Sequence, residues 1–537
     1  MRRIALSAAA LFGLALLAGC VSSEALYEDV HASRTAAYAE WKQQHDSQEA
    51  SRTRLSGKLT LADGLALALL NNKPLLAAAQ ARAAARGDEV ASYSSVLPKL
   101  SGTAGYTRQD KVASFDIGGQ TIPLGFVNNF SAGLNVSQPV FRGGAITAQL
   151  RSGVIGICLS DEGLRAQAQQ TIYDVARGYY DTLLAQELVA VNEEAVKSAE
   201  GHLKDVTARR GQGMASEYDV LRAQVDVSNF RAEMIQQQNR VHLAMAALFK
   251  TMGVSQDSVV ELSDTMNYAP MKPVIEEAVR LAHENRPDLY RAEFGVRLQR
   301  EALRIAYSRY WPSVDATYNR VWSRPDPHDT MLDAWGSAWN AGVAVTWPIF
   351  DGLAREGAVM RERAVLKQRH IELLDAEERA LLDVQQAILS IRDAEEFVES
   401  QRLNLERAKE GLRLVEVGYR EGVNSEVEVT DARSALARAK ELHYQAVYQH
   451  NVARLDLQRA MGILGPRPGT ERIPKEPPVK PSDPGPFGAP PGPSDAPKAG
   501  PDAPPAAPNA PSGPVPAPNA DSPAESPKQN VNTGDHS

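Results

Sequence analysis

Gly422-Val-Asn-Ser425-Glu-Val-Glu-Val429 has a counterpart 209 residues earlier, at Gly213-Met-Ala-Ser216-Glu-Tyr-Asp-Val220. Two further landmarks recur at this offset: Pro139-Val-Phe141 with Pro348-Ile-Phe350, and Met252-Gly253 with Met461-Gly462. A constant offset across separated landmarks indicates that one structural unit has been duplicated without net insertion between them. Two repeats of this length form two halves of one body rather than a solenoid.

The duplication extends toward the start of each repeat. Asn72-Lys-Pro74 is echoed by Asn285-Arg-Pro287, and Leu97-Pro98 by Trp311-Pro312, at offsets of 213 and 214 residues. Each Asn-Lys/Arg-Pro break separates two predicted helices, and Thr60 is a candidate cap for the first of them. We therefore expect a first repeat over residues 59–253 and a second over residues 274–463.

Each repeat also contains a long stretch without proline, residues 145–210 and 353–420. At 1.5 Å per residue such a helix reaches roughly 100 Å. This length favours coiled-coil-like packing, and the steps of four and three between Val384, Ile388 and Ile391 agree with it.

The long helices are predicted to turn and return as helical hairpins, over about 145–253 and 353–462. Ser216 and Ser425 are candidate N-caps of the return helices, because serine side chains accept hydrogen bonds from the first helical N–H groups. Gly213 and Gly422 permit the tight turn before each cap.

After Pro98 and Pro312 the period of the sequence changes from that of a helix to two. Apolar residues alternate with small, mostly polar ones, uncharged except for Asp315, in four segments: 100–107, 130–137, 313–319 and 339–347. A strand with one face in lipid and the other in a wet lumen has this pattern. A soluble hairpin with one buried face alternates too, but Trp339 and Trp347 bracket the last segment as aromatic girdles do at membrane interfaces. We predict β-hairpins over about 98–140 and 312–350.

The N-terminus has the features of a bacterial export signal. Met1-Arg-Arg3 is basic, Ile4–Leu17 is apolar or small, and Leu17-Ala-Gly-Cys20 follows, which predicts a signal peptide over residues 1–19. Leu-Ala-Gly-Cys resembles a lipobox, in which the Cys20 thiol carries acyl chains such as palmitate. The alternative is an ordinary signal peptide with a chance cysteine. The resemblance to enterobacterial lipoproteins, with Val21 rather than Asp after the cysteine, favours the outer membrane, and we expect residues 20–58 to be a lipidated N-terminal segment.

The remaining composition excludes several classes of protein. A net charge of −8 over 537 residues gives no reason to expect nucleic acid as a partner. Cys158 has no intrachain partner if Cys20 is acylated. The sequence contains no metal-ligand cluster, phosphate loop or nucleophile elbow, so we predict no enzyme activity, no catalytic residue, no metal and no cofactor. Residues 466–537, rich in Pro and Ala, are predicted to be a disordered periplasmic tail.

The duplicated order of helices, strands and helical hairpin resembles the TolC family of outer-membrane efflux and secretion channels, over about residues 59–463. The sharpest match is Tyr419-x-x-Gly422-x-x-Ser425, with its twin at Gly213 and Ser216. The resemblance implies an α/β membrane protein: a trimeric, 12-stranded outer-membrane β-barrel continued by a long periplasmic α-helical coiled-coil barrel. Four strands in one chain would leave two open edges in lipid, which other copies must close.

The resemblance also assigns residues at the helix turns. Asp219 and Tyr419 match a pair that is hydrogen-bonded in the closed state of the family, and Glu428 and Asp431 match acidic rings that face the lumen. Three copies of each carboxylate would attract cations, and their mutual repulsion would raise some of their pKa values. Asn424 stands where some members have an arginine that locks the closed tip. The turns at Gly213, Ser216, Gly422 and Ser425 would contact the adaptor protein.

These observations predict a passive outer-membrane exit duct of a tripartite efflux system. The expected partners are two further copies, a periplasmic membrane-fusion (adaptor) protein, an inner-membrane pump of the RND or ABC type, and outer-membrane lipid. One alternative is the outer-membrane component of type I protein secretion. Another, of a different class, is a non-channel periplasmic coiled-coil structural lipoprotein, which explains the helices and Cys20 but not the strands bracketed by tryptophan.

Overall fold

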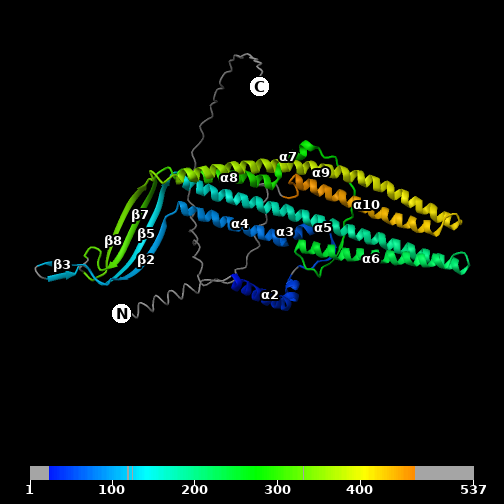
Figure 1. Cartoon of the computed structure of the whole chain (residues 1–537), viewed down its shortest axis with the longest axis horizontal. Coiled ribbons are helices and arrows are strands. Elements are labelled where there is room, and N and C mark those ends of the chain that lie inside the picture. Colours follow the sequence, from blue (N-terminus) through cyan, green and yellow to red (C-terminus); the bar gives the residue numbers. More distant parts are fainter. Residues whose placement is uncertain (1–22, 52, 118–119, 124, 330–331, 466–537) are drawn as a thin grey trace, which may run out of the picture. The chain divides into compact units, whose positions relative to one another are not determined.

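The computed structural model describes residues 23–51, 53–117, 120–123, 125–329 and 332–465 (Figure 1). They all belong to one unit, Met1–Lys475. The predicted signal peptide, Cys20 and the Pro/Ala-rich tail lie outside the described residues. None of the described helices is both long enough and apolar enough to cross a membrane.

The described elements fall into an N-terminal segment and two repeats. The N-terminal segment holds α2 (Ser23–Ser51) and β1 (Ser56–Leu59). The first repeat contains α3 (Leu61–Asn71), α4 (Lys73–Ser92), the short 3₁₀ helix η1 (Tyr93–Ser95), β2 (Lys99–Arg108), β3 (Ser114–Ile117), β4 (Gln120–Pro123), β5 (Asn128–Arg142), α5 (Ala145–Gly211) and α6 (Glu217–Met252). After β6 (Val259–Leu262), the second repeat contains α7 (Ile275–Asn285), α8 (Pro287–Ser308), β7 (Ser313–Arg324), β8 (Gly336–Thr346), α9 (Ala354–Arg420) and α10 (Glu426–Ala460).

The corner between the first two helices of each repeat is fixed to the end of the return helix. Thr60 caps α3, as expected. The Asn72 side chain accepts a hydrogen bond from Leu75 N (3.0 Å) and donates one to the Thr251 carbonyl (2.7 Å). In the second repeat the Arg286 guanidinium donates to the Ala460 carbonyl at the end of α10 (3.4 Å) and also binds Asp383 of α9 (2.8 Å).

The Met-Gly landmarks mark the helix ends that these corners contact. Gly253 and Gly462 have φ angles of 72° and 69°, a left-handed conformation that glycine adopts without steric cost. A Cβ at either position would also collide with backbone, of Asn71 in one repeat and of Asn285 and Arg286 in the other. Glycine is therefore required at both positions, because its φ angle is positive there and because a Cβ would collide with the backbone of the corner.

The two repeats also bind each other. Gln169 Nε2 on α5 donates a hydrogen bond to the Gly462 carbonyl at 2.7 Å. Arg165, on the same helix, donates to the Asn285 carbonyl. Because both acceptors lie in the second repeat, the first long helix is held in part by residues from the other half of the chain.

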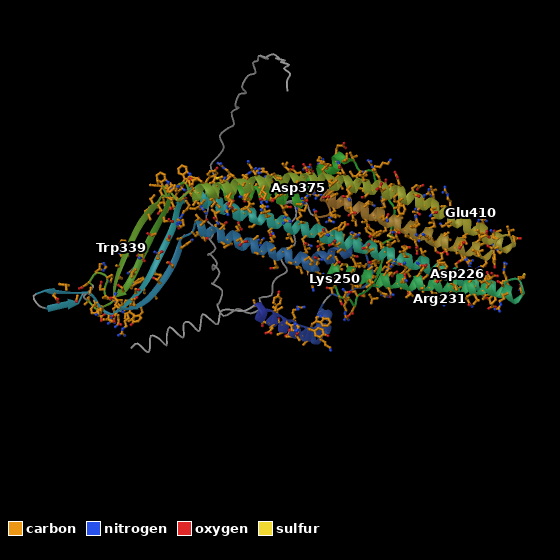
Figure 2. All side chains as sticks on the ribbon, viewed as in Figure 1. Asp226, Arg231, Lys250, Trp339, Asp375 and Glu410 are labelled. Atoms are coloured by element: carbon orange, nitrogen blue, oxygen red, sulfur yellow. The ribbon has the colours of Figure 1, made fainter. Side chains whose placement is uncertain are left out.

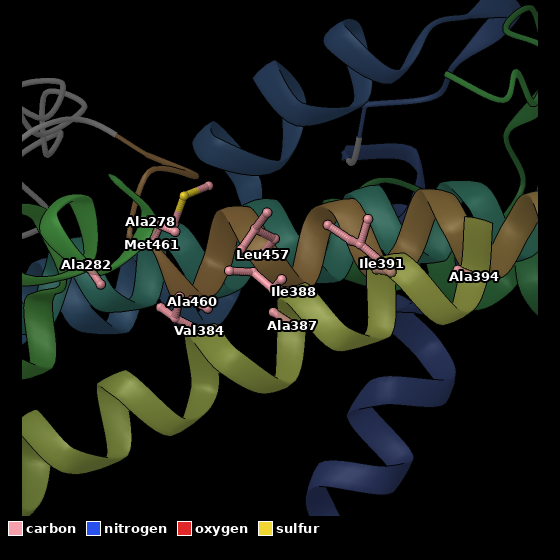
Figure 3. Packing of buried hydrophobic residues seen from close by; sticks show 11 residues of the cluster. Ala278, Ala282, Val384, Ala387, Ile388, Ile391, Ala394, Leu457, Ala460 and Met461 are labelled. Carbon is pink, nitrogen blue, oxygen red and sulfur yellow. The ribbon is translucent and has the colours of Figure 1, made fainter. Parts of the chain in front are cut away.

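The long helices α5 and α9 contain 67 residues each. α5 packs against α6, α9 packs against α10, and α5 also contacts α10, so the two hairpins lie side by side. Val384, Ile388 and Ile391 are buried, as their spacing predicts, and they pack with Leu457 and Ala460 of α10 (Figure 3). Charged side chains such as Asp375 and Glu410 project from the exposed side of α9 (Figure 2).

The main sheet is antiparallel, with strand order β2-β5-β7-β8. Its register places the predicted apolar residues on one face: Leu100 lies opposite Val136, Tyr106 opposite Phe130, and Val314 opposite Val345. Trp339 belongs to this face and projects from the sheet (Figure 2). The alternation predicted from the sequence is therefore present in all four strands.

Five elements differ from the expectation: α2, the pair β1 and β6, and the pair β3 and β4. The mixed N-terminal segment contains α2, whose apolar side chains Tyr27, Val30 and Tyr38 are exposed. β1 pairs in parallel with β6, Ser56 lying opposite Val259. Between β2 and β5, within the hairpin predicted over about 98–140, β3 and β4 form a second hairpin. Each is a short or weakly patterned segment without the apolar periodicity that reveals the longer elements.

Candidate gate at the helical turns

The two helical turns have the same local structure, a glycine with a positive φ angle followed by a serine N-cap. Gly213 and Gly422 both have φ = 78°, and Ser216 and Ser425 cap α6 and α10 as predicted. Each serine forms a capping box with an acidic residue three positions on, Asp219 in the first repeat and Glu428 in the second. The reciprocal bonds satisfy N–H groups that a helix start leaves without partners.

Glu428 is held by the residues of its own turn. Its Oε2 accepts hydrogen bonds from Ser425 N (2.7 Å), Ser425 Oγ (3.1 Å) and Asn424 Nδ2 (3.1 Å). The backbone hydrogen bond from Ser425 and the side-chain bond from Asn424 lower the pKa of the Glu428 carboxyl. Within one chain the pKa shift is thus opposite to the rise expected from a ring of carboxylates. Asp431, three residues on, is also exposed.

Asp219 and Tyr419 lie close together but have other direct partners. Asp219 accepts hydrogen bonds from Ser216 N (2.9 Å) and Ser216 Oγ (2.8 Å). The Tyr419 ring lies 5.8 Å from the His202 ring and 4.7 Å from the Arg209 guanidinium carbon. Burial raises the pKa of Tyr419 to about 12, helped next by the Glu426 carboxylate and to a smaller degree by Asp219.

A buried contact beside these residues was not predicted from the sequence. His202 Nε2 of α5 meets Glu426 Oε1 at the start of α10, and the two side chains are only 6% and 7% exposed. The second carboxylate oxygen of Glu426 is buried without a hydrogen-bond partner among the described residues. The two residues are 224 positions apart and lie in different repeats, so no local sequence motif predicts the pair.

Two further polar contacts accompany this pair. Thr430 Oγ1 of α10 donates to Asp226 of α6 at 2.9 Å, and Arg433 binds Glu416 of α9 at 3.0 Å. We call the six residues of these three contacts the tip cluster: His202, Asp226, Glu416, Glu426, Thr430 and Arg433. Two of its three contacts join the first hairpin to the second, so the tip cluster holds the hairpins together near their turns.

The described residues contain no group of three or more His, Cys, Asp or Glu side chains that could hold a metal ion. The contacts that the described residues form at the turns are ion pairs and hydrogen bonds. Such contacts can hold two helices together or release them.

Comparison with known proteins identifies the chain. The sequence profile described as "Outer membrane efflux protein" matches residues 64–254 and 278–463, one repeat each. The chain belongs to this family of outer-membrane channels. It is accordingly an outer-membrane protein and not an enzyme.

Two relatives illustrate the range of the family. The chain is 25% identical over 408 residues to the pyoverdine export outer membrane protein OpmQ of Pseudomonas aeruginosa, covering 74% of this chain and 83% of OpmQ. It is 24% identical over 416 residues to protein CyaE of Bordetella pertussis, covering 76% and 85%.

Solved structures share the fold. CusC superposes with a TM-score of 0.66 at 18% identity, covering 75% of this chain and 92% of CusC. The CmeC channel of Campylobacter jejuni superposes with a TM-score of 0.64 at 19% identity, covering 76% and 87%. At these identities the likeness establishes the fold alone.

Proposed function

We propose that the protein is the passive, trimeric exit duct of a tripartite efflux system. The observation that carries this proposal is the union of a four-stranded sheet, apolar on one face, with two long helical hairpins in one chain. The sheet supplies a wall in the outer membrane, and the hairpins extend the wall into the periplasm. Transport energy comes from an inner-membrane pump of the RND or ABC type.

The need for further copies follows from the edges of the sheet. Strands β2 and β8 have a neighbouring main-sheet strand on one side only. Backbone N–H and C=O groups at a sheet edge cannot remain unpaired in hydrocarbon. Closure through two more copies gives a ring of 12 strands with no edge.

Exposed apolar residues on α6 support the same assembly. Tyr218, Leu221 and Val225 are each more than half exposed and are spaced by three and four residues. This is the spacing of a coiled-coil seam. The seam fits a helix of the next copy in a barrel of helices.

The helix turns are the proposed gate and the adaptor contact. Glu428 and Asp431 are exposed one turn apart on α10, so three copies would form two acidic rings that favour cations. Asp219 and Tyr419 belong to the closed state. The outermost residues Gly213, Ser216, Gly422 and Ser425 meet the periplasmic adaptor.

The exported substrate is proposed to be a small molecule, as the name of OpmQ suggests for that relative. The chain is also 21% identical to the alkaline protease secretion protein AprF, which supports type I protein secretion as the second candidate. Export assays in a strain that lacks the protein, with a panel of antibiotics and a secreted protease as readouts, distinguish the two.

Purification in detergent followed by planar-bilayer recording tests the duct itself. We expect a mass of three chains and discrete ion conductance. A monodisperse monomer without conductance would contradict the proposal and favour the structural lipoprotein.

A further inference from the structure

Basic side chains follow the seam between α8 and α9 at the end of these helices that is nearest the sheet. Arg363 Nε of α9 donates a hydrogen bond to Tyr307 Oη of α8 (2.9 Å), and Arg300 Nη2 of α8 lies 3.3 Å from His370 Nε2 of α9. Two more basic residues fall between these contacts in the sequence, one on each helix. We call the six exposed residues of this row the cationic stripe: Arg300, Arg304, Tyr307, Arg363, Lys367 and His370.

Most of the positive charge of the cationic stripe has no counter-charge in the chain. Arg304 binds the buried carboxylate of Glu301 at 2.5 Å. Among the described residues, Arg300, Arg363 and Lys367 form no ion pair with a carboxylate. A row of like charges attracts ligands of the opposite sign, so the stripe fits an anionic partner.

The first repeat lacks this charge at the equivalent positions. The offsets of 214 residues between α4 and α8 and 209 between α5 and α9 identify those positions: Arg86, Val90, Tyr93, Val154, Cys158 and Asp161. One of the six is basic and one is acidic, against four arginine or lysine residues in the cationic stripe. Val90 and Val154 are 67% and 52% exposed, so burial does not account for the missing cations.

The cationic stripe lies on the same side of the helices as α7. In steps of four and three residues, the stripe continues along α9 from His370 to Val384 and Ile388, and such steps stay on one side of a helix in a layer of packed helices. Val384 and Ile388 belong to the cluster that packs against Ala278 and Ala282 of α7 (Figure 3). Because a helix on the inner side would obstruct the passage of the proposed duct, α7 and the cationic stripe lie on its outer side.

The stripe begins directly below the aromatic residues at the edge of the sheet. Trp311 and Trp347 are both 62% exposed, and Trp347 Nε1 donates to the Tyr310 carbonyl at 3.1 Å. Exposed tryptophan is typical of the membrane interface. Arg300 lies eight residues before the end of α8 at Ser308, about 12 Å along the helix. The head-group layer beside the hydrocarbon is roughly 5–8 Å thick, and long basic side chains extend their charged ends toward it.

We infer that the cationic stripe binds the head group of an anionic phospholipid in the inner leaflet of the outer membrane. This inference rests on the proposed function, because the duct sets the stripe on the outer side. Guanidinium groups bind phosphate oxygens through paired, charge-assisted hydrogen bonds, which Arg300 and Arg363 can supply, and basic clusters between helices bind lipid head groups in this way. A zwitterionic phospholipid adds an ammonium group that the stripe repels, so it binds more weakly.

Native mass spectrometry of the full-length protein in detergent tests this site, with phosphatidylglycerol and phosphatidylethanolamine as probes. We expect the wild-type protein to prefer phosphatidylglycerol. The triple variant Arg300→Gln/Arg363→Gln/Lys367→Gln should bind it roughly 100-fold more weakly, about fivefold for each cation removed. Lys367→Gln alone, at a residue that contacts no carboxylate among the described residues, should weaken binding about fivefold without disturbing the fold.

A matched control removes the same charge from α9 farther from the sheet. Its three substitutions replace exposed arginines that are bound to carboxylates: Arg379→Gln, Arg402→Gln and Arg413→Gln. This control should bind phosphatidylglycerol as the wild-type protein does. Equal loss in the control and in the triple variant would assign binding to net charge and overturn the site.

The remaining outcomes separate the ligand from the duct. Undiminished phosphatidylglycerol binding by the triple variant overturns the site. Equally tight binding of inorganic phosphate, or binding of the wild-type protein to purified peptidoglycan but not to phosphatidylglycerol vesicles, overturns lipid as the ligand. A conducting trimer without preference for the anionic lipid overturns the lipid site alone. A monomer without conductance overturns the proposed function, and with it the outer position of the cationic stripe.

Discussion

At the scale of single residues, capping boxes hold the two helical turns, and the His202–Glu426 contact lies beside them. Ser216 and Ser425 were predictable as caps because capping depends on neighbours within one turn of helix. The contact of His202 with Glu426 was not, because its partners come from different repeats. A lone histidine on a helix has no sequence signature that distinguishes a core residue from one side of an ion pair.

The acidic residues of the second turn give the first prediction. Glu428→Gln with Asp431→Asn should lower the preference for cations in single-channel recordings, because two rings of negative charge are removed. Glutamine at position 428 can still take part in a capping box, so the turn keeps its fold. The exposed pair Glu399→Gln with Glu410→Gln on α9 is the matched control. Unchanged selectivity in a correctly assembled Glu428/Asp431 variant would place both residues outside the lumen.

The lowered pKa of Glu428 gives a prediction about pH. A carboxyl whose pKa is lower in the folded state stabilises that state at neutral pH, and the contribution is lost as the pH falls through the folded pKa. Protection of the first turn of α10 from hydrogen exchange, corrected for intrinsic rates, should therefore decline below the ordinary glutamate pKa of 4.5. Glu428→Gln should abolish this pH dependence. An equal decline in both proteins would assign it to another group.

The His202–Glu426 contact predicts an asymmetry between single and double variants. His202→Ala leaves a buried carboxylate without its partner and should destabilise the packing of the two hairpins by roughly 3–5 kcal/mol. His202→Leu with Glu426→Leu replaces both polar groups by apolar ones and should recover most of the loss. Thermal unfolding of the purified protein measures both effects. A double variant as unstable as the single one would show that shape, not charge, decides the contact.

At the scale of secondary-structure elements, apolar alternation predicted the four main strands, and long stretches without proline predicted the long helices. Strand alternation was readable because each strand has one apolar face throughout, as Leu100 opposite Val136 illustrates. β1 and β6 were not predicted, since each has four residues and their pairing joins positions about 200 residues apart. α2 was missed because its apolar residues, such as Tyr27 and Tyr38, face solvent and form no stripe.

The two faces of β8 yield a prediction for assembly. Val343 is 69% exposed on the apolar face, so Val343→Arg should cost about 2–4 kcal/mol per chain in lipid and reduce the yield of assembled protein. Gly342 is on the other face, and a Cβ there would meet no atom closer than Thr317 Oγ1 at 4.0 Å. Gly342→Arg should assemble and alter conductance instead. Equal assembly defects in the two variants would contradict the assignment of the faces.

At the scale of the whole molecule, the predicted lipid anchor is Cys20, which precedes both repeats in the sequence. Cys20→Ala should prevent acylation and leave the precursor unprocessed or mislocalised, because the thiol is the proposed attachment point. Cys158→Ala, which removes the other cysteine, is the control and should be labelled normally by a fatty-acid analogue. Labelling of Cys20→Ala at the wild-type level would refute lipidation at this position.

The hydrogen bond from Gln169 to the Gly462 carbonyl has a consequence for biogenesis. The acceptor follows the donor by 293 residues, so the first half of a chain being exported reaches the periplasm long before its partner arrives. Contacts between residues far apart in the sequence make folding slow. Until the second repeat has been translocated, the apolar faces of the helices in the first repeat stay exposed and can aggregate. We therefore expect a chaperone to hold the N-terminal repeat unfolded until translocation has delivered the C-terminal one.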